Sequence, residues 1–501
     1  MGAVGTRAVC EDLARQGHAL IELERGSLDT KLWKDVKRKR VRIPDLVCQR
    51  CGIRVESRAK TKPELSMSHS VTDATRAWDF GMVDSDWIAF PVCEAVAEQD
   101  WSNGRLGSES SYWHERNWVR WKAKPRINYF DVRTFRSIPF TKVATKGVTE
   151  GSETAVAWDA VFSTRTGTVA ARDGQRLTIA RDGDGHRHTR AIPPALDIHV
   201  ESGQPVLENQ VIASKLMPII GTAQACPDAL PANHIASLLV SRERTQRFAG
   251  IKLARVRSER GFGDIAAELA ADREEDVYIR LEAVSYLVAV GGRSAKAAFG
   301  EYLDSTDEQT RLEAVIAVGE SATPDAVEFL SEILDDHRTP YFLRSAAAWG
   351  LSRVGGEYAV ARLVRAFADI DQSIREEALE GMIAVGGPAL PLLLGGLKGV
   401  SSEIAAGCAE ALRQQGTFSP EIVARIVADV QRLPQAQWSV WLLGQLPREQ
   451  VAPAIAGLQT QAPELHYAVT LLWTFVESWI AKRWELRPGF AFPGIDPVYE
   501  V

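Results

Sequence analysis

The sequence is poor in cysteine and has no long uninterrupted apolar run. Its six cysteines, at positions 10, 48, 51, 93, 226 and 408, are too few and too scattered over 501 residues to form a disulfide framework. The first residues lack the apolar stretch of a secretory signal. The late apolar stretch HYAVTLLWTFVESWIAKRW is short and is interrupted by Glu477, Lys482 and Arg483, so it does not predict a membrane span. We therefore expect a cytoplasmic protein with no membrane association.

The chain also lacks a strong overall charge. The formal net charge is -6, with 45% apolar and 25% charged residues, which is the composition of a folded protein and no global sign of nucleic-acid binding. The charge is nevertheless uneven, because residues 31–60 hold eleven Lys or Arg against three acids, whereas the region after Asp264 is mostly acidic. This asymmetry predicts a basic functional head on an acidic scaffold, within a chain long enough for two to four domains.

A repeat dominates the C-terminal half. Similar alanine-rich segments begin at Arg280, Arg311, Arg344 and Arg375, at intervals of 31, 33 and 31 residues. Each reads as an amphipathic helix, usually ended by glycine and followed by a second helix, and a fixed period of this length predicts a stack of helical pairs. The pattern resembles HEAT repeats of the short type. It predicts an α-solenoid over 235–417, followed by a helical cap and tail over 418–501.

Residues 125–216 have a different sequence pattern. Short alternating runs are separated by Gly-Asp turns, which predicts antiparallel strands. The segment HVESGQPVLENQVIA resembles half of a barrel-sandwich hybrid, but no attachment lysine motif accompanies it. We expect a structural β-rich module without a swinging-arm role.

The first 124 residues predict a small α/β head. The helix TRAVCEDLARQGH precedes the strand ALIELERGS, the strands VRIPDLVC and GIRVESRAKT are joined by the turn QRCG, and the strand DWIAFPVC follows at 86–93. Over about residues 1–95 this order resembles the PD-(D/E)xK nucleases, with the best match to restriction-endonuclease-like and Holliday-junction-resolvase-like members. The predicted fold class is multidomain α+β, with a restriction-endonuclease-like α/β head, a central barrel-sandwich-hybrid-like β-rich module and a C-terminal HEAT-repeat α-solenoid.

A metal-binding acidic pair is predicted in this head. Asp45 and Glu56 fall on neighbouring antiparallel strands, and strand periodicity places Glu56, Arg58 and Lys60 on one face. Carboxylates with cations beside them suit hydrolysis of a phosphodiester with Mg²⁺ or Mn²⁺. The resemblance implies that Asp45 and Glu56 hold the metal, with Glu11 as a supporting acid.

The catalytic assignment of the bases stays open in the sequence. The family pattern has Glu-x-Lys, whereas this chain has Glu56-Ser57-Arg58, and arginine cannot act as a base. Either Lys60 takes that role, or Arg58 only stabilises charge, or the site is inactive. The alternative is a surface hairpin whose acids neutralise neighbouring bases.

The turn Cys48-Gln49-Arg50-Cys51-Gly52 has the form of a zinc knuckle. A tetrahedral structural zinc site needs two further ligands. We expect Cys93 and His69 as the nearest partners, with His18 and His114 as more distant ones. The alternative is a pair of reduced thiols without metal.

Basic and aromatic residues cluster on either side of these motifs. Bases next to the predicted metal strand suit phosphate contacts, and tryptophans interleaved with bases suit base stacking. The alternatives are a solvated charge run and a small aromatic core. The predicted nucleic-acid-binding residues are Lys34, Lys37, Arg38, Lys39, Arg40, Arg42, Trp118, Arg120, Trp121 and Lys122.

Together these patterns predict a metal-dependent nucleic-acid endonuclease. DNA is the favoured substrate over RNA, the HEAT stack would bind a partner protein or a duplex, and a role in bacterial defence or DNA repair follows by analogy. The alternative is a non-enzymatic HEAT-repeat adaptor whose basic, zinc-containing head binds nucleic acid or protein.

Overall fold

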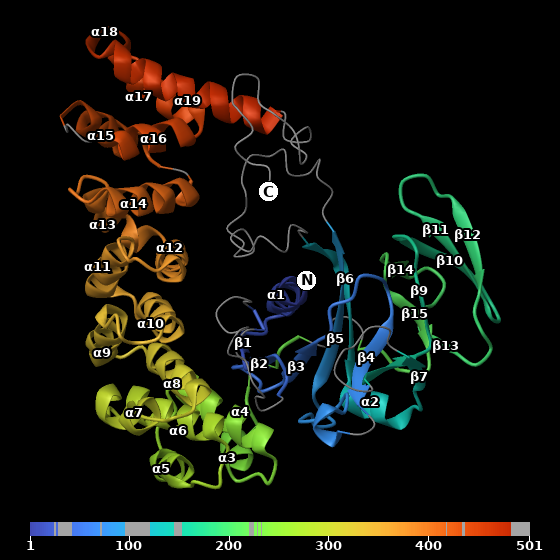
Figure 1. The fold of residues 1–501 in the computed structure, drawn as a ribbon. Coiled ribbons are helices and arrows are strands. Elements are labelled where there is room, and N and C mark those ends of the chain that lie inside the picture. The colour runs from blue at the N-terminus through green and yellow to red at the C-terminus, as the bar shows by residue number, and fades with distance from the viewer. Residues whose placement is uncertain are drawn as a thin grey trace. The chain divides into compact units, whose positions relative to one another are not determined.

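The computed structural model describes residues 1–24, 27–28, 43–70, 73–95, 121–144, 153–219, 225–227, 229–231, 233–416, 418–432 and 436–481. They form two compact units (Figure 1). The first unit consists of the described residues up to Gly291, and the second of those from Gly292 onward.

A five-stranded sheet is the centre of the first unit. Its strands lie in the order β1-β2-β3-β5-β6, with β3 and β5 parallel and the other neighbours antiparallel. The strands are β1 (Leu20–Glu22), β2 (Leu46–Cys48), β3 (Arg54–Ser57), β5 (Trp87–Ala95) and β6 (Trp121–Asp131). The predicted head/module boundary at 124/125 therefore falls inside β6, whose pairing with β5 keeps it in this sheet.

Helices cover both faces of the strands at the N-terminal edge of the sheet. On one face, α1 (Gly2–Ala14) buries Val9 and Leu13 against Leu46 and Val55. On the other, Leu23 and Val47 belong to the apolar core formed with four helices, which are α3 (His234–Leu239), α4 (Arg244–Val256), α5 (Gly263–Ala271) and α6 (Val277–Ala289). The alternation of Leu46 and Val47 between these two cores is the period-two pattern of a strand buried on both faces.

Further sheets make the rest of the first unit rich in β structure. One has the order β4-β8-β7, another β13-β15-β9, and a third β12-β11-β10-β14. The elements are β4 (Leu65–Ser70), η1 (Ala74–Arg76), α2 (Val132–Ser137), β7 (Thr141–Ala144), β8 (Glu153–Trp158), β9 (Ala160–Phe162), β10 (Gly167–Asp173), β11 (Arg176–Arg181), β12 (Arg187–Ala191), β13 (Asp197–Ile198), β14 (Pro205–Val206) and β15 (Val211–Ser214).

The second unit is a stack of antiparallel helical pairs (Figure 1). Its elements are α7 (Ala295–Leu303), α8 (Glu308–Ser321), α9 (Pro324–Asp335), α10 (Tyr341–Val354), α11 (Gly356–Ala366), α12 (Gln372–Val385), η5 (Gly387–Ala389), α13 (Leu390–Gly396), α14 (Ser402–Gln415), α15 (Pro420–Arg432), α16 (Gln437–Gln445), α17 (Arg448–Ile455), α18 (Leu458–Gln461) and α19 (Pro463–Ala481). The recurring arginine has a structural role, because Arg344 Nε donates to the Leu334 carbonyl at 2.8 Å, one of the carbonyls that the end of α9 leaves without a helical partner.

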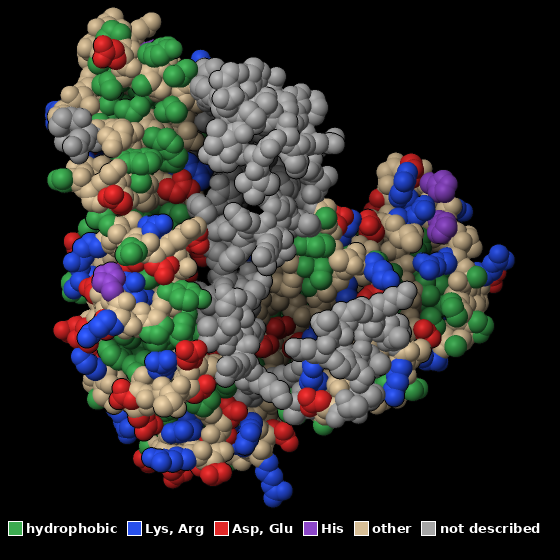
Figure 2. Space-filling view, viewed as in Figure 1, with side chains coloured by type: hydrophobic (Ala, Val, Ile, Leu, Met, Phe, Trp, Pro, Cys, Tyr) green, Lys and Arg blue, Asp and Glu red, His purple; other side chains and the backbone are tan. Residues whose placement is uncertain are grey.

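The surface of the helical repeats mixes both signs of charge. Figure 2 shows acidic and basic side chains interspersed over the face that it draws. Among the described residues, no single helix is long and apolar enough to cross a bilayer, although one bent pair, Gln372–Val385 with Gly387–Gly396, meets that requirement when its two helices are taken together.

Close helix packing in the second unit predicts a glycine-specific effect. A Cβ at Gly407 would overlap the Phe367 ring, whereas a Cβ at Gly300 would have no neighbour within 4 Å. Gly407→Ala should therefore lower the free energy of unfolding of this unit by about 1–3 kcal/mol through overpacking. Gly300→Ala, the control on α7, should raise it by about 0.5–1 kcal/mol because alanine loses less entropy in a helix. Denaturant unfolding followed by circular dichroism measures both, and equal effects of the two substitutions would contradict the packing.

Candidate metal centres

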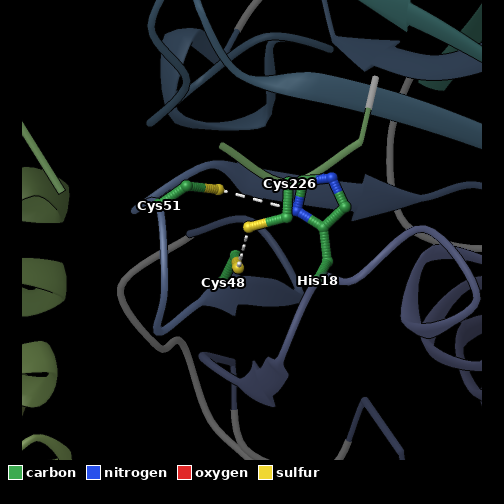
Figure 3. Close-up of side chains that lie close together, drawn as sticks. All are labelled: His18, Cys48, Cys51 and Cys226. Atoms are coloured by element: carbon green, nitrogen blue, oxygen red, sulfur yellow. Dashed lines mark hydrogen bonds between the residues drawn. The ribbon is translucent and has the colours of Figure 1, made fainter. Parts of the chain in front are cut away.

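Three sulfurs and one imidazole converge at the tip of the β2–β3 hairpin. The ligand atoms of His18, Cys48, Cys51 and Cys226 all lie within 4.8 Å of one another, and Figure 3 shows the four side chains pointing toward a common centre. Cys48 Sγ lies 3.9 Å from Cys226 Sγ, and Cys51 Sγ lies 3.5 Å from His18 Nδ1. Zn–S bonds of about 2.3 Å and Zn–N bonds of about 2.0–2.1 Å in a tetrahedron require ligand separations of about 3.5–3.8 Å. The group could therefore hold zinc.

Local backbone geometry brings these ligands together. Gly52 has φ +78°, and its N–H donates to the Cys48 carbonyl at 2.8 Å, which closes the turn between the two cysteines. Gly17 has φ +86° and ends the helical segment before His18. Both conformations are easy for glycine and costly for residues with a Cβ. Cys226 is fixed beside them because its N–H donates to the Gln16 carbonyl at 2.9 Å.

The sulfur group favours a thiolate. The pKa of Cys48 is lowered to about 3, chiefly because the Cys51 thiol donates a hydrogen bond to its sulfur, with a further contribution from His18. The same hydrogen bond raises the pKa of Cys51. Thiolate is the form of cysteine that binds metals, so the surroundings of Cys48 suit a ligand.

The predicted ligand set is corrected at two positions. Cys48 and Cys51 belong to the group as expected, and His18, expected as a more distant partner, belongs to it as well. His69 lies instead on β4, where its Nδ1 accepts a hydrogen bond from the Trp78 N–H at 3.3 Å, and Cys93 is buried in β5.

Cys226 takes the remaining place, and the sequence interpretation missed it. It is separated from Cys48 by 178 residues, and no local spacing pattern connects the two. His114 lies outside the described residues.

An acidic pair lies at the other end of the same hairpin. The β2–β3 register pairs Leu46 with Val55, so Asp45 and Glu56 come next on the two strands. Asp45 Oδ2 accepts the Ser57 N–H at 2.7 Å, and the Asp45 N–H donates in turn to the Glu56 carboxylate. Asp45 thus lies directly before β2 and Glu56 lies on β3, the neighbouring antiparallel strand.

Both acids are buried, at 9% exposure for Asp45 and 6% for Glu56. Burial raises the pKa of Asp45 well above its usual range, and the charges of Glu56 and Glu24 raise it further. Burial also raises the pKa of Glu56 to about 7, although Arg58 acts to lower it. Burial thus favours the neutral forms of both carboxyls, and a bound cation would favour their charged forms.

The bases expected near this pair lie along an extension of β3. Arg58 forms an ion pair with Glu56 at 3.0 Å. The chain stays beside β5 as far as Lys60, whose N–H donates to the Pro91 carbonyl at 2.9 Å. Because the segment is extended, Glu56, Arg58 and Lys60, which are two residues apart, lie on one face of it.

Lys60 is oriented by a short polar chain. Its Nζ donates to Ser66 Oγ at 3.0 Å, and Ser66 Oγ donates to Glu64 Oε1 at 2.8 Å. Burial lowers the pKa of Lys60.

Glu11, the expected supporting acid, is on the exposed side of α1. Glu24 is a further acid, and its charge raises the pKa of both Asp45 and Glu56.

Only two of the predicted nucleic-acid-binding residues are among the described residues. Trp121 is half-buried and Lys122 is exposed, at the start of β6 opposite Ala95 and Glu94 of β5. The others lie outside the described residues, namely Lys34, Lys37, Arg38, Lys39, Arg40, Arg42, Trp118 and Arg120.

A buried ion pair anchors the strand that carries Glu56. Arg54, 4% exposed, donates to both carboxylate oxygens of Asp86, with its Nε 2.8 Å from Oδ1. Arg54 also donates to the Thr245 carbonyl of α4 at 3.3 Å, so the same side chain connects β3 to the helical layer.

Loss of this anchor should be costly. Asp86→Ala leaves a buried guanidinium without its carboxylate and should destabilise the first unit by about 3–5 kcal/mol. Asp84→Ala is the matched control, because Asp84 is 52% exposed and its ion pair with Arg136 should contribute less than about 1 kcal/mol. Denaturant unfolding compares the two variants, and a cost for Asp86→Ala as small as that of the control would contradict the anchoring role.

The chain is similar to several solved structures and to two family models. No curated protein shows significant similarity to the sequence. Among solved structures, similarity extends to an engineered protein (16% identity, 49% of this chain and 78% of that chain, TM-score 0.23) and to human deoxyhypusine hydroxylase in complex with glycerol (17%, 45% and 99%, TM-score 0.19). It also extends to the complex of CpcE and CpcF of phycocyanin lyase from Nostoc sp. PCC7120 (18%, 43% and 94%, TM-score 0.21).

Two family models match within the predicted repeat region. Residues 266–346 match the model of HEAT repeats, and residues 343–369 match the PBS lyase HEAT-like repeat. These matches confirm HEAT repeats within part of the predicted 235–417. The C-terminal part of the chain carries HEAT repeats, joined to an N-terminal region that is rich in β structure.

Proposed function

We propose that the acidic pair is the centre of a nuclease that hydrolyses phosphodiester bonds with Mg²⁺ or Mn²⁺. The observation that carries this proposal is the pair itself: Asp45, directly before β2, and Glu56, on β3, are both buried, and Arg58 and Lys60 follow directly after β3. Buried like charges are costly, so an arrangement of this kind favours a role that a cation completes.

The donor set fits a hard divalent cation. Mg²⁺ is commonly bound by one or two carboxylates, with waters and substrate phosphate oxygens as its other ligands. Asp45 and Glu56 would therefore suffice as protein ligands. When bound, the cation would make a coordinated water more acidic and stabilise charge on the phosphate.

The remaining residues would have separate tasks. Arg58 stays protonated, so it would contact a phosphate oxygen and stabilise the charge that develops there. Lys60, with its lowered pKa and its hydrogen bond to Ser66, is the better candidate to accept the proton of the attacking water. The water oxygen forms the new bond to phosphorus, the bond to the ester oxygen breaks, and that oxygen takes a proton from solvent.

The wider assignment follows from this centre. DNA is the proposed substrate over RNA, and the HEAT repeats would bind a partner protein or a duplex, in bacterial defence or DNA repair. We also propose a restriction-endonuclease-like fold for the head and a barrel-sandwich-hybrid-like fold for the β-rich module. Zinc at the His18/Cys48/Cys51/Cys226 group would be structural, and a reducing cytoplasm would keep its thiols available.

Cleavage assays test the nuclease proposal. Asp45→Asn and Glu56→Gln remove a metal-binding charge while keeping the side-chain shape, and each should lower the Mg²⁺-dependent rate by at least about 100-fold, since one preorganised electrostatic group is typically worth about 10²–10³ in rate. Linear and supercoiled DNA, single-stranded DNA and RNA are incubated with Mg²⁺, Mn²⁺ or EDTA and analysed on gels. Glu94→Gln, at an exposed acid of β5, is the control and should cleave normally.

The outcomes separate the two functions that the sequence leaves open. Cleavage that survives both substitutions would rule out this centre. Binding without cleavage, weakened when the bases at 37–40 are neutralised, would instead favour the adaptor.

Metal binding at the acidic pair should also be visible in stability. Mg²⁺ in excess over its dissociation constant should raise the melting temperature of the wild-type first unit, because a ligand of the folded state stabilises by about 2.7 kcal/mol at 100 times the dissociation constant. Glu56→Gln should abolish that response, because a neutral amide does not replace a carboxylate ligand of Mg²⁺. Scanning calorimetry measures both shifts, and an equal Mg²⁺ response in the two proteins would exclude this pair as the binding site.

A further inference from the structure

We infer that zinc bound by His18, Cys48, Cys51 and Cys226 links Cys226, which precedes helix α3, to the tip of the β2–β3 hairpin. This role goes beyond the proposed phosphodiester hydrolysis and does not depend on it. Its basis is the origin of the ligands, because they come from three separate segments of the chain. His18 follows α1, Cys48 and Cys51 flank the hairpin turn, and Cys226 lies after the last β-strand and before α3.

Hydrogen bonds already converge on the same turn. Arg50 donates to the Gly17 carbonyl at 3.2 Å, which connects the turn to the end of the helical segment before His18. Arg257, directly after α4, donates to the Gln49 carbonyl at 2.7 Å. The turn between the two cysteines therefore contacts both the start of the chain and the helical layer.

The start of α3 packs directly against this turn. A Cβ at Gly52 would overlap the His234 ring and would lie 2.9 Å from Leu230 Cδ2, so the glycine allows a close approach of the two segments. The apolar core shared by the sheet and helices α3–α6 contains Val47 of β2 but neither Cys48 nor Cys51. At the tip of the hairpin, polar contacts and the metal would therefore hold the segments together, as apolar packing does further along the strands.

The ligand chemistry selects the metal and its task. Three thiolates and one imidazole in a tetrahedron are a set that zinc occupies in structural sites, with no position open for substrate. Because such a site assembles only when its segments meet, the free energy of zinc binding contributes to holding them together.

Metal analysis tests the ligand set. Protein purified under reducing conditions should contain about one zinc per chain by elemental analysis. Co²⁺ in its place should give the visible absorption of a tetrahedral thiolate site. Cys226→Ser should weaken metal binding by more than about 100-fold, since changes to outer-shell partners alone cost about 10–100-fold. Cys10→Ser, at a half-buried thiol outside the group, should leave the metal content and the Co²⁺ spectrum unchanged.

Hydrogen exchange tests whether zinc links Cys226 to the tip of the hairpin. Removing zinc from the wild type with a chelator should accelerate exchange of the Cys226 and Gly52 amides, and of the first turn of α3, by at least about tenfold. Amides of the second unit, from Gly292 onward, should be unaffected. Cys226→Ser should show the fast exchange without any chelator, and Cys10→Ser should behave like the wild type.

Three results would overturn the inference. They are the absence of stoichiometric zinc, zinc binding that Cys226→Ser leaves intact, and exchange at Cys226 that does not respond to metal removal. Each of them is independent of whether the protein cleaves nucleic acid. A failure of the nuclease proposal would appear instead as zinc-loaded protein, with the exchange behaviour expected here, that does not cut.

Discussion

The pairing of β2 with β3 is the interaction on which both candidate centres depend. This antiparallel ladder is short, with Leu46 opposite Val55 and Val47 opposite Arg54. At one end its turn presents the thiols of Cys48 and Cys51, and at the other it brings the buried acids together. A single hairpin thus carries a soft sulfur and nitrogen site and a hard oxygen site, which prefer different metals.

The two centres differ in how their charges are compensated. In the sulfur group the ligands stabilise one another, because the Cys51 thiol donates to Cys48 and lowers its pKa. In the acidic pair burial is the largest cause that raises the pKa values of Asp45 and Glu56, the charge of Glu24 adds to it at both, and Arg58 acts in the opposite direction. Strongly perturbed carboxyl pKa values cluster at functional sites, so the acidic pair is the better candidate for chemistry and the sulfur group for structure.

The sequence predicted what is local and missed what is distant. The HEAT repeats were readable because each helical pair repeats a local pattern, and the hairpin was readable because a Cys-x-x-Cys-Gly turn and a shared strand face are short-range features. The sequence did not indicate that Cys226 belongs to the sulfur group or that Glu24 acts on the acidic pair. Both residues come close to these groups only through the tertiary fold. His69 and Cys93 were the nearest ligands in sequence, but the sheet places them elsewhere. The predicted boundary at 124/125 falls within β6, because composition does not reveal that β6 pairs with β5.

A short ladder has a further consequence for the two centres. Side chains alternate between faces along a strand, so a slip of one residue would turn Glu56 toward α1 and bring Val55 to its place. Two residue pairs specify the register weakly by themselves. The bond from the Ser57 N–H to Asp45 fixes one end of the hairpin, and the closed turn from Gly52 to Cys48 fixes the other. A metal held by both cysteines would reinforce the turn, and the geometry of the acids would then depend on a site that takes no part in their chemistry.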